Sequence, residues 1–433
     1  MNEKQTLDEA AGRNRPRSRL LRDRDFMTFW FGETLAMFGA RITALALPLV
    51  AAITLNATPL QMGILNAVEV APYLLVTLFA GVWIDRLRKR PLLLGANIAR
   101  ALLLAVIPCA YALGRLDMGL LYACGFLVGV CTLIFDLSYQ SYLPSLVGRE
   151  DLVEGNSKLE ISRSAAEVGG PSVAGALIGI MAAPFTILIH SVLLLISAVS
   201  ISLVRKREEI PPRPAGKRTP MLAEIREGIS FVFRNPYLKA IAGEATTYNF
   251  FSQVIWAVMI LYVVRSLGIG AELLGFIMGA ASVGSILGSL SAGYLARRFG
   301  VGPTLCGATA LGCAAPLLLL IAGGSIAVSA PILFLFFFLS GLGVVISNIH
   351  IVSLRQTVTP DRLLGRMNAS YRFVVTGAVP LGSLLGGWLG SQFGLRPTLA
   401  LGSIGMLFAL LWIVSSPIPK LRTLQDIANE RAS

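Results

Sequence analysis

Apolar runs of membrane-spanning length recur along almost the whole chain. A helix needs about 20 consecutive apolar residues to cross the hydrocarbon core of a bilayer. Within that core every backbone N–H and C=O group must find a partner inside the segment, so runs of this length predict helices rather than strands. The sequence therefore predicts an all-α membrane protein with twelve transmembrane helices, near residues 27–53, 61–84, 91–113, 118–140, 158–181, 184–205, 237–264, 272–296, 302–323, 329–350, 367–391 and 397–415.

The composition agrees with a lipid environment and excludes several functional classes. Hydrophobic residues make up 55% of the 433 residues and charged residues only 14%, against about 25% charged in an average soluble domain. The net charge of +13 does not indicate nucleic-acid binding, because Lys and Arg cluster in short segments between apolar runs. We expect no metal or other cofactor, because the five cysteines lie inside apolar runs without paired spacing and the chain has only two histidines.

The basic residues predict the orientation of the chain in the membrane. Connections on one side of the membrane are rich in Lys and Arg, whereas those on the other side have only three basic residues near them, Arg115, Arg265 and Arg396. By the positive-inside rule, both termini then lie in the cytosol and the number of spans is even. The first apolar run is too long for a signal peptide, so we expect it to be retained in a multi-pass protein of the plasma membrane, the inner membrane of a bacterial cell. The basic segments on the cytosolic side are residues 13–24, 86–90, 205–218, 297–298 and 420–422.

An internal repeat divides the spans into two related sets. Gly63 recurs as Gly275, 212 residues later, and Asn156 recurs as Asn368 at the same offset. Two tandem six-helix bundles follow, an arrangement known in transporters that bind substrate between their halves. Between them, residues 221–233 have the pattern of an amphipathic helix. The predicted organisation is a basic cytosolic tail (1–25), a first bundle (26–205), a cytosolic linker (206–236), a second bundle (237–415) and a cytosolic C-terminal tail (416–433).

The loop after the second span carries a motif, Gly81-Val-Trp-Ile-Asp85-Arg86-Leu-Arg88-Lys89-Arg90. It resembles the loop motif of the major facilitator superfamily, although Arg88 stands where a second glycine is usual. Residues 135–140, 143–147 and 170–171 further resemble the branch that contains macrolide-efflux proteins and the enterobactin exporter. This resemblance covers residues 22–415 and implies the major facilitator fold and export of drugs, siderophores or other amphipathic compounds, without identifying the substrate.

The resemblance also implies residues that control conformation. Asp85 would act as a latch against the start of helix eleven, where the helix dipole favours a carboxylate. Asp136 would form a gate salt bridge with the basic loop. The alternative is that the loop cations only anchor the loop on anionic headgroups. The run 169–175 resembles the glycine-proline motif of proton antiporters, with static packing as the alternative reading. The candidate gating residues are Gly81, Asp85, Arg86, Lys89, Arg90, Asp136, Gly170 and Pro171.

Charged side chains inside the predicted spans are candidates for the transport cavity. Each costs at least about 2.5–3.5 kcal/mol near the bilayer centre, so one that persists needs a partner, a wet cavity or a role. Arg41, Glu69 and Arg100 lie near mid-membrane. Glu69 is the first candidate to load and release a proton. Burial favours the neutral form of a carboxyl group, whereas a nearby arginine favours the charged form. A permanent Glu–Arg pair is the alternative. Glu33 either shares this role or faces the cytosolic vestibule.

Span five places Glu160, Arg163 and Glu167 on one helical face, so that Arg163 can pair with either acid. Of the two acids, Glu167 lies deep enough to be a second proton site. His190 is either hydrogen-bonded structure or a proton relay. In span seven a polar stripe either lines the substrate path or packs internally; its residues are Glu244, Asn249 and Gln253.

The sequence thus predicts a secondary active transporter that exports a small amphipathic compound, drug-like or siderophore-like, by proton antiport through alternating access. The expected partners are the small-molecule substrate, protons and the lipid bilayer, and we expect a monomer. A facilitator, an uptake system or a lipid-related transporter on the same fold is the alternative. A membrane-embedded enzyme or a receptor is remote, because no catalytic cluster, Walker loop or large extramembrane domain is present.

Overall fold

The computed structural model describes residues 19–75, 87–148, 151–206 and 221–423, and every regular element within these ranges is a helix. The first half of the chain contains α2 (Arg19–Arg22), α3 (Arg24–Leu49), the π-helix η1 (Val50–Thr54), α4 (Pro59–Leu75), α6 (Lys89–Ala112), α7 (Met118–Val147), α8 (Leu152–Ile180) and α9 (Ala183–Leu203). The second half contains α10 (Met221–Arg234), α11 (Pro236–Leu261), the π-helix η2 (Tyr262–Ser266), α12 (Ala271–Phe299), α13 (Val301–Ala314), the 3₁₀ turn η3 (Ala315–Leu317), α14 (Leu318–Ile321), α15 (Ile326–Val358), α16 (Asp361–Phe393), α17 (Leu395–Val414) and the 3₁₀ turn η4 (Ile418–Lys420).

Within these ranges, ten helical segments are long and apolar enough to cross a membrane, which confirms the all-α membrane fold. Two of the twelve predicted spans are not among them. The second predicted span, 61–84, runs past the described part of α4, which ends at Leu75. The fifth span corresponds to α8, whose N-terminal part carries five charged residues. The ten segments are therefore consistent with twelve spans.

Several helices are longer than their apolar runs. Helix α7 continues to Val147 rather than ending near residue 140, and α8 begins at Leu152 rather than near 158. Likewise α15 continues to Val358 and α16 begins at Asp361. All four extensions lie at one end of the bundle. Hydropathy marks only the part of a helix that lipid surrounds, whereas helical hydrogen bonding continues into water wherever polar residues permit it.

The 212-residue repeat is visible in the backbone. The two π-helices, η1 and η2, begin 212 residues apart, and each is followed by a residue with positive φ, Asn56 (φ 50°) and Gly268 (φ 66°). The backbone hydrogen bonds are repeated too, since Ala57 N donates to Ala51 O as Ile269 N donates to Val263 O. Such matched local geometry is expected when two bundles share one ancestral pattern of packing.

Two glycine crossings join the bundles at what we call the closed end. Near the start of α4, a Cβ on Gly63 would lie 2.8 Å from Gly387 Cα of α16. At the equivalent position in the second half, a Cβ on Gly275 of α12 would lie 2.8 Å from Gly175 Cα of α8. Only glycine permits backbones to approach this closely. Arg265 of η2 adds a hydrogen bond from its Nη2 to the main-chain carbonyl of Ala52 (2.9 Å).

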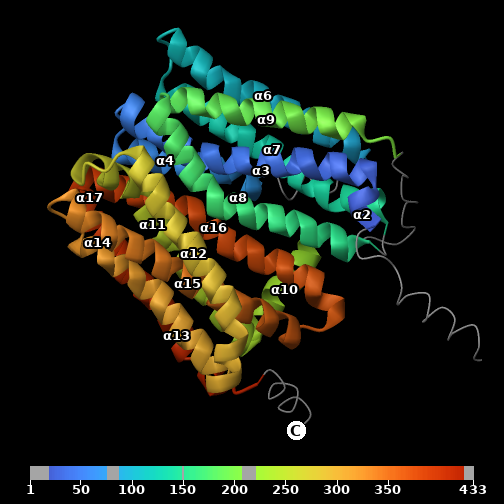
Figure 1. The fold of residues 1–433 in the computed structure, drawn as a ribbon. Helices are drawn as coiled ribbons and strands as arrows, with labels where there is room; N and C mark the ends of the chain where they lie inside the picture. Colours follow the sequence, from blue (N-terminus) through green and yellow to red (C-terminus); the bar gives the residue numbers. More distant parts are fainter. Residues whose placement is uncertain (1–18, 76–86, 149–150, 207–220, 424–433) are drawn as a thin grey trace, which may run out of the picture.

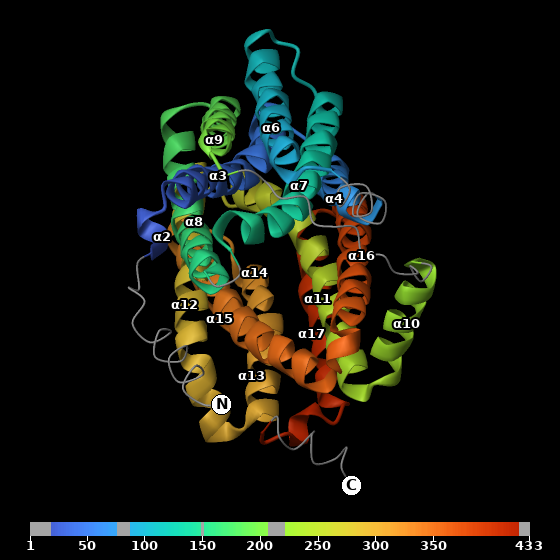
Figure 2. The same ribbon diagram turned by 90° about the vertical axis from the view of Figure 1, so that its right-hand side faces the viewer.

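At the other end, the open end, the two bundles diverge. Figure 1 shows them meeting where α4 and α17 begin and separating toward α2 and α10, and Figure 2 views the molecule from the open end. The apolar core follows the same division. One cluster of buried side chains joins both halves at the closed end and includes Val50 and Tyr262. Two further clusters, around Phe26 and around Leu354, each belong to one half.

Candidate functional site

A cavity of about 330 Å³, which we call the interface cavity, lies between the two bundles. Its second-half wall is largely aromatic and apolar and includes Trp256 of α11 and Phe336 of α15. Its first-half wall is contributed by α3 and α8. A concave, mostly apolar pocket with a few polar groups is the usual form of a small-molecule site. The full lining is Arg41, Glu167, Pro171, Tyr248, Ser252, Ile255, Trp256, Met278, Ala281, Ser282, Ser285, Pro316, Phe336, Phe337, Ser340, Gly341, Val344 and Met406.

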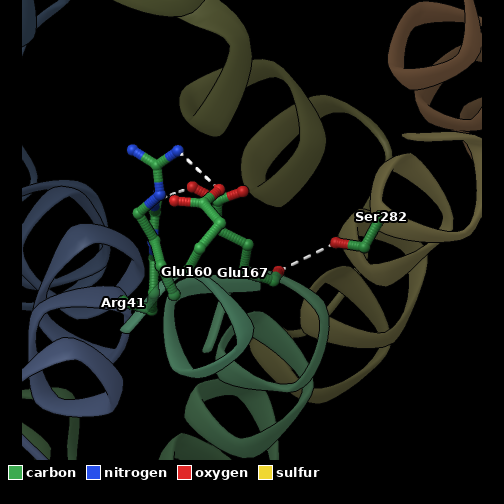
Figure 3. A network of polar contacts seen from close by, with 5 residues as sticks. Arg41, Glu160, Glu167 and Ser282 are labelled. Atoms are coloured by element: carbon green, nitrogen blue, oxygen red, sulfur yellow. Dashed lines mark hydrogen bonds and ion pairs between the residues drawn. The ribbon is translucent and has the colours of Figure 1, made fainter. Parts of the chain in front are cut away.

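One ion pair lines the interface cavity on its first-half side. Arg41 Nη2 lies 2.6 Å from Glu167 Oε1, and the two side chains are 43% and 47% exposed. Gly170 makes this possible, because a Cβ there would lie 3.0 Å from Arg41 Cγ. Ser282 of α12 donates to the main-chain carbonyl of Glu167 (2.8 Å), which ties the pair to the second half (Figure 3). The pair is thus held in place yet half open to the cavity.

Glu160, Arg163 and Glu167 of span five do not act as one group. Arg163 bonds Glu160 (Nη2 to Oε1, 2.8 Å), and both side chains are more than half exposed. Glu167 instead pairs with Arg41 of α3. The structure therefore brings together two predicted cavity residues, Arg41 and Glu167, through a contact between helices that sequence spacing could not indicate.

A second cavity, of about 170 Å³, lies within the first half between α3, α4, α6 and α7; we call it the first-half cavity. Glu69 and Tyr73 of α4 contribute to its wall, with Thr43, Cys124 and Thr132 as further polar residues. Among the described residues, Glu69 makes no ion pair and no side-chain hydrogen bond, so no described arginine forms the permanent pair considered above. The remaining lining is apolar or glycine: Leu47, Leu104, Ile107, Gly125, Val128 and Gly129.

A buried charged cluster lies next to this cavity. Glu33 of α3 and Arg100 of α6 are only 7% and 8% exposed, so Glu33 is buried rather than open to a vestibule. The Arg100 guanidinium lies 4.5 Å from the centre of the Phe135 ring and donates to Asn97 Oδ1. Glu33, Arg100 and Asp136 of α7 lie within electrostatic range of one another. The cluster brings together predicted residues from three helices.

The predicted gating residues are only partly placed. Gly81, Asp85 and Arg86 lie outside the described residues, so the proposed latch stays a prediction. Arg90, in the first turn of α6, donates from Nη2 to the carbonyl of Ser202 at the end of α9 (2.7 Å), and Lys89 beside it is buried. Asp136 accepts a hydrogen bond from the Tyr73 hydroxyl (2.8 Å), and Arg372 of α16 acts on it electrostatically from the second half. Pro171 lines the interface cavity.

The polar stripe of α11 does not line either cavity. Glu244 is buried within the second half. Gln253 faces α16, where Ser383 Oγ lies 3.4 Å from its Oε1, and Asn249 is half-buried. The face that does line the interface cavity carries Tyr248, Ser252, Ile255 and Trp256.

Three functional candidates were missed from the sequence. Tyr73 follows Glu69 by four residues, and this spacing places both on one helical face. The spacing is the sequence signal that links Tyr73 with Glu69. Phe336 and Phe337 sit in an uninterrupted apolar run, which does not distinguish a cavity wall from a lipid-facing surface. His190, for which the sequence leaves a structural role and a relay open, is buried. Its Nδ1 lies 2.8 Å from Thr43 Oγ1.

The profile of a family described as transmembrane secretion effector matches residues 19–432. The chain belongs to this family of the major facilitator superfamily. The multidrug efflux pump Tap of Mycolicibacterium fortuitum is 26% identical over 408 residues, which cover 92% of this chain and 97% of that protein. An uncharacterised transporter of the superfamily, YfiS of Bacillus subtilis, is 24% identical and covers 92% and 94% of the two chains.

Solved structures confirm the major facilitator fold. A bacterial homologue of the iron transporter ferroportin in its inward-facing state superposes with a TM-score of 0.71 at 19% identity, over 90% of this chain and 98% of that one. A bacterial homologue of ferroportin in an outward-facing state gives a TM-score of 0.57 at 19% identity. The family and these structures are transporters rather than enzymes, so the chain is a multi-pass membrane transporter with a small-molecule substrate.

Proposed function

We propose that the protein is a secondary active transporter that exports a small amphipathic compound through the interface cavity in exchange for protons. The observation that carries this proposal is the composition of that cavity, which sets aromatic side chains of one half against a half-exposed ion pair of the other. The likeness to a multidrug efflux pump supports export as the direction.

The cavity suits a compound with distinct apolar and polar parts. Its volume of about 330 Å³ lies near the lower end of the range for ligand pockets. Trp256 and Phe336 offer apolar faces that exclude water from a hydrophobic ring or chain. Arg41 and Glu167 satisfy each other without a ligand, and their exposed atoms can also accept or donate hydrogen bonds to a polar substituent.

The places where the halves touch support alternating access. The two glycine crossings and the Arg265 hydrogen bond hold the closed end together, while the open end carries both described termini. With the termini in the cytosol, as the basic residues favour, the described state takes up substrate from the cytosol. We place this monomer in the plasma membrane, with bundles at 26–205 and 237–415 joined by a cytosolic linker.

Glu69 is our candidate for the proton-carrying acid. It lies in a cavity inside the first half without a described ion-pair partner, so protonation there breaks no ion pair with a described residue. Glu167 is the second candidate, but its carboxylate is held by Arg41 at 2.6 Å. An acid that alternates between two exposures can load a proton on one side and release it on the other.

The test is accumulation of four probes, namely ethidium, rhodamine 6G, erythromycin and enterobactin, in cells with and without the protein. We expect at least one probe to accumulate less when the protein is present, and an uncoupler to abolish the difference. If all four probes accumulate equally in cells with and without the protein, export is refuted.

The proton-carrying role is tested with the Glu69→Gln variant. It should lose uncoupler-sensitive export, whereas the Glu160→Gln variant should keep it, because Glu160 lies outside both cavities. Export that persists in Glu69→Gln but depends on the substrate gradient alone would assign the residue to coupling. Export that still depends on the proton gradient and runs at the wild-type rate would remove Glu69 from the mechanism.

A further inference from the structure

We propose that Tyr73 relays the proton from Glu69 to Asp136, along a route inside the first half that is separate from the substrate cavity. This inference rests on the proposed proton-coupled export and adds a route and two residues to it. It stands on three observations: the cavity shared by Glu69 and Tyr73, the hydrogen bond from Tyr73 to Asp136, and the disjoint linings of the two cavities.

Glu69 and Tyr73 lie on the same face of α4, one helical turn apart. Both side chains line the first-half cavity of about 170 Å³. A water molecule occupies about 30 Å³ in the liquid, so a space of this size can hold a short water chain. Thr43 and Thr132 on the same wall offer hydroxyl groups that such waters need as partners.

Glycines of α7 keep space beside Glu69. A Cβ on Gly129 would lie 2.8 Å from the main-chain oxygen of Glu69 and 3.0 Å from Pro72 Cγ, and one on Gly125 would lie 3.4 Å from Glu69 Cγ. Helix α7 can therefore approach α4 closely at the acid without placing a side chain against it. Gly125 and Gly129 also belong to the lining of the first-half cavity.

The Tyr73 hydroxyl points from this cavity to Asp136. It donates its proton to Asp136 Oδ2 at 2.8 Å, so it is already aligned for transfer in that direction. The charged groups facing Asp136 come from three other helices: Arg100 of α6, Glu33 of α3 and Arg372 of α16. The two arginines favour the carboxylate form of Asp136, which keeps it ready to accept the Tyr73 hydrogen bond and favours release of a proton that it has received.

The transfer balances without any co-reactant. Protonated Glu69 gives its proton to a cavity water, that water gives one of its protons to the Tyr73 oxygen, and Tyr73 gives its original hydroxyl proton to Asp136 Oδ2. Glu69 becomes a carboxylate and Asp136 a carboxylic acid, while Tyr73 and the water are unchanged. Asp136 then loses its proton on the open side, where Arg372 of the second half faces it.

Among the described residues, none lines both cavities. Protons and substrate therefore do not compete for one acid, and coupling must pass through movement of a helix. Helix α4 is suited to this, because it carries Glu69 and Tyr73 and also Gly63 of the crossing with α16. A change of charge at Glu69 thus acts on the same helix that closes the far end.

The decisive variant is Tyr73→Phe, which keeps the ring and removes only the hydroxyl. It is tested in proteoliposomes with whichever of the four probes the wild-type protein carries fastest. We expect transport driven by a pH gradient to fall at least about tenfold, in line with the loss of a proton-transfer group. Probe–probe exchange needs no net proton movement, so it should stay within about twofold of the wild type.

Tyr122→Phe is the matched control, because its hydroxyl donates to the carbonyl of Gln61 (3.2 Å) outside the first-half cavity; it should leave both activities intact. Asp136→Asn should reproduce the split between the two activities and serves as well if Tyr73→Phe fails to fold. Normal gradient-driven transport in Tyr73→Phe, or equal loss of exchange and gradient-driven transport, would overturn the relay alone. A wild type that carries none of the probes would overturn the proposed function and the relay with it.

Discussion

Replacing Gly275 by alanine tests the glycine crossing that holds the closed end together. The new Cβ would lie 2.8 Å from Gly175 Cα and closer still to the carbonyl oxygen of Pro171. Both are backbone atoms of α8, so no side chain can rotate out of the way. Because ordinary carbon contacts begin near 3.4 Å, α8 and α12 must separate by several tenths of an ångström at this point.

The cost falls on one conformation only. Overpacking of this kind costs about 1–3 kcal/mol, and the contact is lost when the closed end opens. Since about 1.4 kcal/mol corresponds to a factor of ten in an equilibrium constant, the variant should shift the population by about 5- to 140-fold toward the state that is open at this end. Gly63→Ala should act in the same direction, because it faces Gly387 in the equivalent crossing.

The shift can be read from the distance between spin labels at Thr58 and Ser266, which lie at the closed end of the two halves, after the five native cysteines are replaced. We expect a longer distance to gain population in Gly275→Ala. Gly307→Ala is the control, because a Cβ there meets nothing within 4 Å. Identical distance distributions in the two variants would refute the claim that this crossing sets the conformational balance.

Two further changes test other contacts. Arg265→Gln removes the charged donor to the Ala52 carbonyl. It should favour the state that is open at this end by about 1.5–3 kcal/mol, seen as more population at the longer spin-label distance. An unchanged distance distribution would show that the hydrogen bond does not contribute. Trp256→Ala should raise the half-saturation concentration of a carried probe about tenfold through the lost aromatic contact, whereas Trp388→Ala, at a side chain 47% exposed outside the interface cavity, should not; equal effects would place the substrate elsewhere.

The fold followed from the sequence because lipid allows few solutions. Long apolar runs must be helices. The 212-residue offset already identified Gly63 and Gly275 as equivalent positions. Only the structure shows that each of these glycines meets a glycine of the other half. Helix ends such as Val147 of α7 were placed too early, because hydropathy records where lipid ends and not where helical hydrogen bonding ends.

The site could be predicted only in part. An ionisable residue inside a span is conspicuous, so Glu33, Arg41, Glu69, Arg100 and Glu167 were recognised as candidates. Their grouping could not be, because contacts such as the one between α3 and α8 depend on how helices far apart in sequence pack. Apolar cavity walls carry no such mark in the sequence.

The central claim is that substrate export is exchanged for protons, and direct measurement of proton movement in proteoliposomes tests it best. The protein is reconstituted with a pH-sensitive dye trapped inside, and a carried probe is added outside without an imposed pH gradient. Proton antiport predicts that probe entry makes the lumen more alkaline, and that Glu69→Gln abolishes this change. Probe entry that depends on the wild-type protein but leaves the lumenal pH unchanged would contradict the account.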